Sequence, residues 1–182
     1  SRPVAVGLII VDGLSYYDLP DGVVADPVLV SGITSTEFGY REVIGQPTVS
    51  RRLFHLGYTR QFGFTYFDAQ ANDLARDVYA SFAPTQITRV VEFGEVLEAL
   101  ERVSGGAIFV QITMAGLDQI AHSHWDRPPR KEYLRHILAN CEQLHELLER
   151  RFGETLTVLT SDHGILWREE LQGRLTMGDD LF

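Results

Sequence analysis

Three short runs of mainly apolar residues stand out along the chain: 4–11 (VAVGLIIV), 107–113 (AIFVQIT) and 155–160 (TLTVLT). Continuous runs of this kind are typical of strands that are buried on both faces of a parallel sheet. Residues 59–67 alternate enough, with aromatic side chains, to predict another strand, and residues 27–30 are predicted to form a short one after a turn-rich segment. We expect these segments to form the sheet of the protein.

Apolar residues at helical spacing separate these strands. The longest helix is predicted over 130–152, where apolar residues mark one buried stripe. Helices are also predicted over 48–56 and 94–103, and weaker helical patterns cover 68–83 and precede Gly45. Strands that alternate with helices imply βαβ units. We therefore expect an α/β fold, with a mostly parallel sheet and helices on both faces, in one domain that covers 1–182.

Composition narrows the class of protein. A length of 182 residues suits one domain, and none of the apolar runs is long enough to cross a bilayer. The formal net charge of −9 argues against a protein that coats nucleic acid, because such a protein carries a basic face. The single cysteine, Cys141, fits the reducing cytoplasm. Because Ser1 leads almost directly into a strand, without a signal peptide, we expect a domain cut from a longer protein with further domains.

Polar residues follow the predicted strands at the points where the strands end. In chain order they are Asp12; Thr34 and Ser35; Asp118 and His122; and Asp162 and His163. The carboxyl ends of parallel strands lie at one edge of a sheet, which is where open α/β sheets carry their binding sites. The sequence therefore predicts that carboxylates, imidazoles and a hydroxyl share one crevice.

Carboxylates that lie so close together repel one another unless a cation is present. Aspartate and histidine together are a ligand set that a zinc-like ion accepts. Each group also has a structural interpretation: Asp12 can belong to a turn, Asp118 and His122 can form a pair on one helical turn, and Asp162 can cap a turn beside a structural His163. Their combination favours a metal site.

Four motifs together resemble the alkaline phosphatase superfamily. They are residues 11–13 (VDG), 32–35 (GITS), 118–122 (DQIAH) and 161–164 (SDHG), and their order along the chain also matches. Within the superfamily, the chain looks closest to the PglZ-type domain and to nucleotide pyrophosphatase/phosphodiesterase-like members. The resemblance implies hydrolysis of a phosphoester bond in a phosphorylated small molecule or nucleotide, with a preference for diesters taken from these relatives.

The resemblance also implies two divalent metal ions, zinc first and manganese as an alternative. Asp12, Asp162, His163 and the nucleophile hydroxyl would bind one ion, and Asp118 and His122 would bind the other. The superfamily usually adds a histidine well downstream, but no histidine follows His163 in this sequence, so the second site is incomplete.

Two hydroxyl groups are candidates for the nucleophile. The residues before Thr34 resemble the stretch that leads into the nucleophile of the superfamily, whereas the spacing to Gly45 favours Ser35. Arg41 and Arg51 are candidate clamps for phosphate oxygens. The alternative to an enzyme is an inactive regulatory or nucleotide-recognition module that keeps the fold and at most one metal ion.

Overall fold

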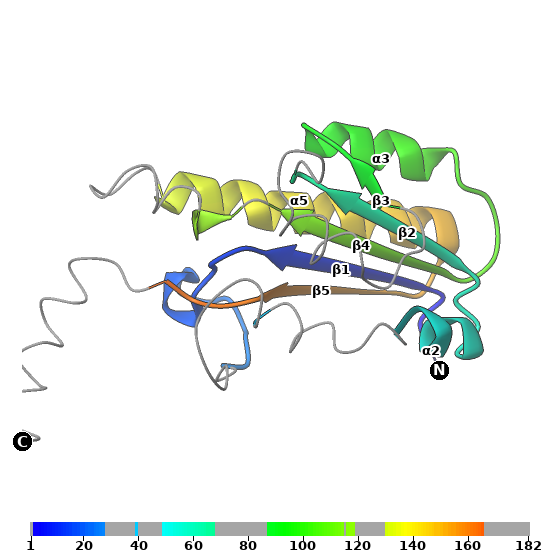
Figure 1. Ribbon diagram of the computed structural model, residues 1–182, viewed down its shortest axis with the longest axis horizontal. Coiled ribbons are helices and arrows are strands. Elements are labelled where there is room, and N and C mark those ends of the chain that lie inside the picture. Colours follow the sequence, from blue (N-terminus) through cyan, green and yellow to red (C-terminus); the bar gives the residue numbers. More distant parts are fainter. Residues whose placement is uncertain are drawn as a thin grey trace, which may run out of the picture.

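The computed structural model describes residues 2–27, 39, 49–67, 87–114, 116–118 and 130–165. Five parallel strands form one sheet in the order β3-β2-β4-β1-β5 (Figure 1). The strands are β1 (Ala5–Val11), β2 (Arg60–Thr65), β3 (Ile87–Arg89), β4 (Ile108–Met114) and β5 (Thr155–Ser161). The helices are α2 (Val49–His55), α3 (Phe93–Glu101) and α5 (Arg130–Phe152), with a 3-10 turn, η1 (Tyr16–Asp18).

The two longest apolar runs form the centre of the sheet. All seven residues of β4 are buried, and β4 pairs with β1 from Ala5↔Ile108 to Val11↔Met114. A strand that is covered on both faces needs apolar residues at successive positions, and this requirement explains the continuous runs in the sequence. The prediction of a mostly parallel sheet is confirmed.

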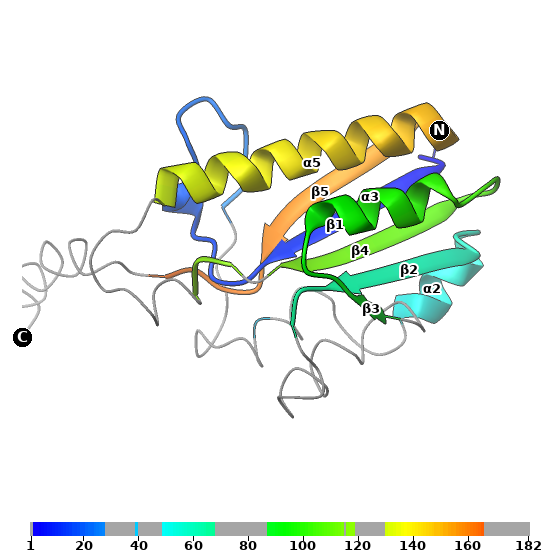
Figure 2. The same ribbon diagram turned by 90° about the horizontal axis from the view of Figure 1, so that it is seen from above.

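Helices cover the two faces of this sheet (Figure 2). On one face, α3 and α5 pack on β1 and β4 through a core that includes Ile9, Leu100 and Leu144. On the other face, Val49 and Leu53 of α2 pack near a smaller cluster around Phe109. The predicted α/β fold with helices on both faces is therefore confirmed.

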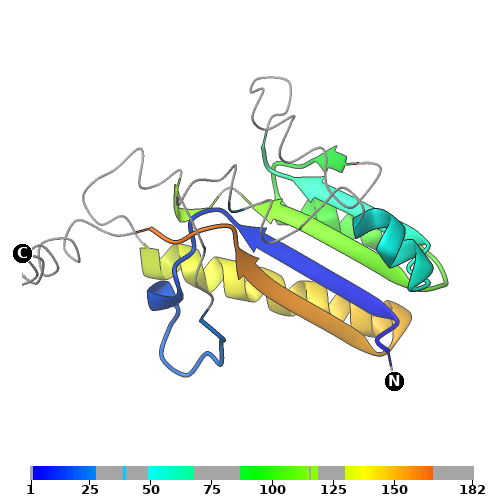
Figure 3. The ribbon, with the colours of Figure 1, turned by 60° about the horizontal axis from the view of Figure 1, so that its bottom comes forward.

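This arrangement favours a binding site at one edge of the sheet. The arrowheads of β1, β4 and β5 point to the same edge (Figure 3). The helix that follows β1 among the described elements, α2, and the helix that follows β4, α5, lie on opposite faces. Such a change of side between neighbouring strands leaves a crevice beyond their carboxyl ends.

Most predicted elements are found within one or two residues of their predicted ends, including α2, α3, α5 and β2. The strand β3 was not predicted, because three residues at the partly exposed edge of a sheet carry almost no periodic signal. The predicted elements over 68–83 and before Gly45 lie outside the described residues, apart from Gly39, as do residues 28–30 of the strand predicted over 27–30. Within the described part of the chain, no helix is long and apolar enough to cross a membrane. The single domain over 1–182 stays a prediction.

Candidate metal centre

Asp12 lies directly beyond β1, and hydrogen bonds of its main chain hold it in place. Its N–H donates to the carbonyl oxygen of Met114 at 3.2 Å, which continues the pairing of β1 with β4. Its own carbonyl oxygen accepts from the N–H of Asp118 at 3.4 Å. The end of β1 is thus joined to the segment that follows β4, and Asp118 lies beside Asp12, as the strand-end argument predicted for these two residues.

This close approach depends on a glycine. A Cβ atom at Gly116 would lie 1.8 Å from the carbonyl oxygen of Asp12, so no larger residue fits there without moving the main chain. On the other strand end, Gly13 has a φ of 74°, a conformation that side chains rarely adopt. Gly13 and Gly116 therefore allow the main-chain segments that follow β1 and β4 to lie in direct contact.

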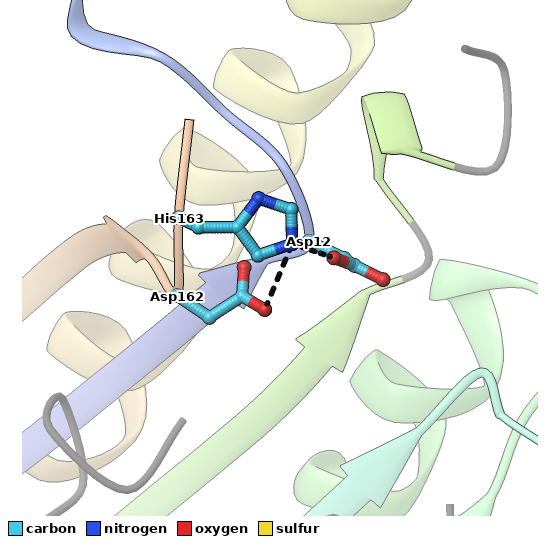
Figure 4. A group of neighbouring side chains, drawn as sticks. All are labelled: Asp12, Asp162 and His163. Carbon is cyan, nitrogen blue, oxygen red and sulfur yellow. Dashed lines mark ion pairs between the residues drawn. The ribbon is translucent and has the colours of Figure 1, made fainter. Parts of the chain in front are cut away.

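Asp162 and His163 reach the same place from β5. The N–H of Gly13 donates to Asp162 Oδ1 at 3.1 Å. His163 Nε2 lies 3.3 Å from Asp12 Oδ1 and 3.6 Å from Asp162 Oδ2 (Figure 4). Asp12 is 5% exposed, Asp162 0% and His163 6%, so water has little access to the three side chains.

The hydrogen bonds of His163 determine which of its ring nitrogens faces the carboxylates as an acceptor. Nδ1 lies 3.3 Å from the carbonyl oxygen of Gly164, which can only accept, so we assign the ring proton of the neutral histidine to Nδ1. The lone pair of Nε2 then points to two carboxylate oxygens. One of these, Asp162 Oδ2, is buried and has no hydrogen-bond partner among the described residues. Three acceptor atoms facing one another need a proton or a cation between them.

The pKa values of the two ligand candidates on the β5 side agree with this need. Burial and the charge of Asp12 raise the pKa of Asp162 to about 7, against the opposing effects of His163 and the N–H of Gly13. Burial alone would lower the pKa of His163, but its hydrogen bond with Asp12 and the charge of Asp162 raise it to about 9. The metal-free site therefore retains protons at neutral pH, and a cation would displace them.

The separation of the three donor atoms fits a zinc-like ion. Two carboxylate oxygens and one imidazole nitrogen lie within 4.8 Å of one another. Ligand atoms around a tetrahedral zinc ion with bonds of about 2.0 Å lie about 3.3 Å apart. The distances from His163 Nε2 to the two oxygens, 3.3 and 3.6 Å, are close to that value.

The other predicted site residues have different outcomes. Thr34, Ser35, His122 and Arg41 lie outside the described residues, so their roles stay predictions. Arg51 lines a surface depression with Arg60 at the start of β2, at the opposite end of the sheet from Asp12. The prediction that Arg51 clamps a phosphate at the metal centre is therefore wrong.

Gly39 is the described residue that is nearest in the sequence to Thr34 and Ser35. It is buried and helical, and a Cβ atom there would lie 2.0 Å from the carbonyl oxygen of Asp162. The main chain four residues after Ser35 thus lies against the metal centre.

Tyr133 of α5 is a neighbour of the site that the sequence did not indicate. Burial and the charge of Asp12 raise the pKa of its phenol, so the hydroxyl keeps its proton at neutral pH. The sequence signal was weak because Tyr133 lies beside the apolar stripe of a long helix, where an aromatic residue is ordinary core material.

Comparison with known proteins shows which family the chain belongs to. No curated protein and no solved structure matches the chain. The family model described as type I phosphodiesterase / nucleotide pyrophosphatase matches residues 36–167, more than half of the chain. The matched range includes Asp118, His122, Asp162 and His163, and it begins after Asp12, Thr34 and Ser35. The chain belongs to the type I phosphodiesterase / nucleotide pyrophosphatase family.

Proposed function

We propose that this protein is a metal-dependent hydrolase of phosphodiester bonds. The observation that carries the proposal is the buried group of Asp12, Asp162 and His163, in which an acceptor oxygen has no hydrogen-bond partner among the described residues. Membership of the family supports phosphoester hydrolysis in general. The position of the group, beyond the carboxyl ends of parallel strands, is the position at which α/β sheets carry active sites.

Asp12, Asp162 and His163 would hold one divalent ion, with zinc as our first choice and manganese as the alternative. When bound, such an ion neutralises phosphate charge and lowers the pKa of a hydroxyl nucleophile. For a second ion we propose Asp118 and His122. The PglZ-type subfamily remains our hypothesis for the place of the chain within the superfamily.

Other residues of the chain would orient the ligands and supply the nucleophile. Gly13 and Gly164 orient Asp162 and His163 through main-chain hydrogen bonds, so that these side chains need not reorganise when phosphate binds. The hydroxyl of Thr34, or of Ser35, attacks phosphorus. The new O–P bond forms while the ester O–P bond breaks, and the proton of the hydroxyl leaves with the alcohol. Water then attacks phosphorus, the bond between phosphorus and the side-chain oxygen breaks, and a proton of the water returns to the hydroxyl as the phosphate monoester leaves. The contact of Gly39 with Asp162 supports a nucleophile from this segment.

A groove beside His163 supports a substrate with a sizeable organic part. The groove has a volume of about 1160 Å³ and runs between β5, α5 and the segment after β1. Its described lining includes Tyr16, Leu138 and Thr157, and it reaches the metal centre at His163. We propose that it accepts one substituent of a phosphodiester, from a small molecule or a nucleotide. We assign the protein to the cytoplasm because Cys141 is its only cysteine.

The test compares bis(p-nitrophenyl) phosphate with p-nitrophenyl phosphate in the presence of zinc or manganese, and again with a chelator. We expect turnover that the chelator abolishes, with the diester as the better substrate. The Asp162→Ala variant should lose this turnover, and Glu98→Ala, which changes an exposed acidic residue of α3 outside the ligand group and the groove, should keep it. Full turnover by Asp162→Ala would contradict the proposal.

The same assay separates the enzyme from the alternative, a recognition module without turnover. Such a module would bind about one metal ion per chain and would bind a nucleotide without cleaving it. Turnover that disappears in Thr34→Ala or Ser35→Ala, while metal binding is retained, excludes the module.

A further inference from the structure

We infer that Ser161 is a positioning residue that fixes the distance between Asp12 and the pair Asp162–His163. The inference rests on the proposed metal site, because its consequence is the spacing of the ligand atoms. Ser161 is the last residue of β5, and it pairs with Val11, the last residue of β1.

The hydroxyl of Ser161 contacts the main chain of both strand ends. Its Oγ accepts from the N–H of Leu14 at 2.9 Å. It also lies 2.8 Å from the carbonyl oxygen of Val11 and 2.5 Å from that of His163. On the β1 side, Val11 and Leu14 flank Asp12 in the sequence. On the β5 side, His163 is itself a ligand candidate.

These contacts account for the proton and one lone pair of the hydroxyl. A serine hydroxyl has one proton to donate and two lone pairs that accept. The N–H of Leu14 takes a lone pair, and the proton goes to one of the nearby oxygens, most closely those of His163 and Val11. Ser161 therefore acts on the site through its neighbours rather than as a ligand.

The position of Ser161 explains why a side chain, rather than strand pairing, joins the ends of β1 and β5. Strand pairing of β1 with β5 ends at the pair Val11↔Ser161, so the ladder between these two strands does not fix Asp12 relative to the β5 side, although Asp12 is bonded to Met114 after β4. Beyond that pair, the described polar contacts between the two segments are Leu14 N–H to Ser161 Oγ, Gly13 N–H to Asp162 Oδ1, and His163 Nε2 to Asp12 Oδ1. All of these except the first involve a ligand candidate. A change of Ser161 thus tests the spacing without removing a ligand.

The distances between the candidate ligand atoms matter because they are already close to those around a tetrahedral zinc ion. The distances from His163 Nε2 to Asp12 Oδ1 and Asp162 Oδ2 are 3.3 and 3.6 Å. Supporting residues around a metal site must hold ligands to within about 0.5 Å, and loss of a supporting residue typically costs about 10- to 100-fold in metal affinity.

The test measures Co²⁺ binding to the full chain, because Co²⁺ can stand in for zinc and has an absorption spectrum that reports ligand geometry. We expect Ser161→Ala to bind Co²⁺ about 10- to 100-fold more weakly, with an altered spectrum. Ser161→Thr restores the hydroxyl and should bind within about threefold of the natural protein, since only a methyl group is added. If Ser161→Ala does not fold, Ser161→Cys keeps the volume with a weaker hydrogen-bonding group.

The matched control is Thr157→Val on the same strand. The hydroxyl of Thr157 lies 3.1 Å from Nδ1 of His145, away from the ligand atoms, so its loss should leave Co²⁺ affinity unchanged. An unchanged affinity and spectrum in Ser161→Ala would overturn the inference. An equal loss in Thr157→Val would do the same, because it would point to general destabilisation.

Hydrogen exchange separates this inference from the metal proposal. In the metal-free protein, the amide of Leu14 should exchange faster in Ser161→Ala than in Thr157→Val. A natural chain that binds no Co²⁺ overturns the proposed metal site, and with it the metal-spacing part of the inference. Unchanged exchange of Leu14 overturns the role of Ser161 in joining the strand ends.

Discussion

The two edges of the sheet differ in how completely their buried or partly buried polar groups are hydrogen-bonded. At the amino edge, the side chain of Gln61 is fully hydrogen-bonded: its Nε2 donates to the carbonyl oxygens of Ser50 and Tyr58, and its Oε1 accepts from the Ser50 hydroxyl. The hydroxyl of Tyr58 donates in turn to Pro3 at 2.8 Å. The carboxyl edge instead brings acceptor atoms together, and Asp162 Oδ2 makes no hydrogen bond with a described residue, its ion-pair contact with His163 Nε2 being 3.6 Å long.

The difference is the one expected between a structural polar cluster and a binding site. A buried polar group that completes its hydrogen bonds contributes modestly to stability, whereas an unsatisfied one costs free energy. One other buried oxygen, Oε1 of Gln111 in β4, also has no partner among the described residues, but it belongs to a neutral amide, and no described group of metal ligands includes it. The combination of charge, burial and a missing hydrogen bond is the basis of our proposal that the carboxyl edge carries the active site.

The largest expected effect is that of Asp162→Asn. The amide keeps an acceptor for Gly13 and, above pH 9, where the ring of His163 is neutral, offers an N–H₂ donor to its Nε2, so the variant should abolish zinc binding and yet stabilise the metal-free protein by about 1–2 kcal/mol at pH 10. Zinc titration and urea unfolding of the same sample measure both effects. A metal-free variant that is less stable than the natural protein would remove the distinction between the two edges.

Gly116→Ala should be the next largest. A Cβ atom at that position would lie 1.8 Å from the carbonyl oxygen of Asp12, and we expect a loss of about 3 kcal/mol in the free energy of unfolding. The control is Gly94→Ala in α3, where a Cβ atom would meet no atom within 4 Å and should stabilise the helix slightly. Equal stabilities of the two variants in urea would show that the strand ends do not cross as tightly as described.

The pH dependence of stability should also differ with and without metal. The pKa of His163 rises from 6.5 to about 9 on folding, so its stabilising contribution is complete below pH 6.5 and is lost as the pH rises through 9. Asp162, with a pKa raised from 3.8 to about 7, adds a loss of the same sign at lower pH. Saturating zinc should remove this loss between pH 6.5 and 9 and leave stability nearly independent of pH, because the ion binds the deprotonated ligands and the folded state then has no proton to release there. Melting temperatures across this range measure both curves, and parallel curves would contradict the metal site.

Gln61→Ala should have the smallest overall effect, because it should lower stability without changing zinc affinity. It tests whether the amino edge and the carboxyl edge of the sheet are independent. Removing the amide leaves the main chain of Ser50 and Tyr58 without its donor, at a cost of about 1–2 kcal/mol. Zinc affinity should not change, because the amino edge does not contribute to the metal centre. A marked loss of zinc affinity in this variant would mean that the two edges are coupled.

The sequence predicted the parts of the molecule that depend on repeated local patterns. The strands β1, β4 and β5 and the helix α5 carry long apolar runs or stripes, and the strand-end rule by itself brings Asp12 and Asp162 to one edge of the sheet. The contacts of Ser161 and Gly116 could not be predicted, because they depend on how closely segments far apart in the chain approach. Arg51 shows the opposite error: proximity in sequence to a candidate nucleophile did not mean proximity in space.

The hydrogen bond between Gly13 and Asp162 joins residues that are 149 positions apart, and β5, which carries Asp162, is an edge strand of the described sheet. A metal ion bound between Asp12 and the β5 side would therefore close almost the whole chain into a loop. By the chain-entropy argument that applies to disulfides, a permanent link of this length is worth about 5 kcal/mol. The ion would act as a reversible cross-link that keeps β5 paired with β1, so that metal supply would control the lifetime of the folded protein as well as its chemistry.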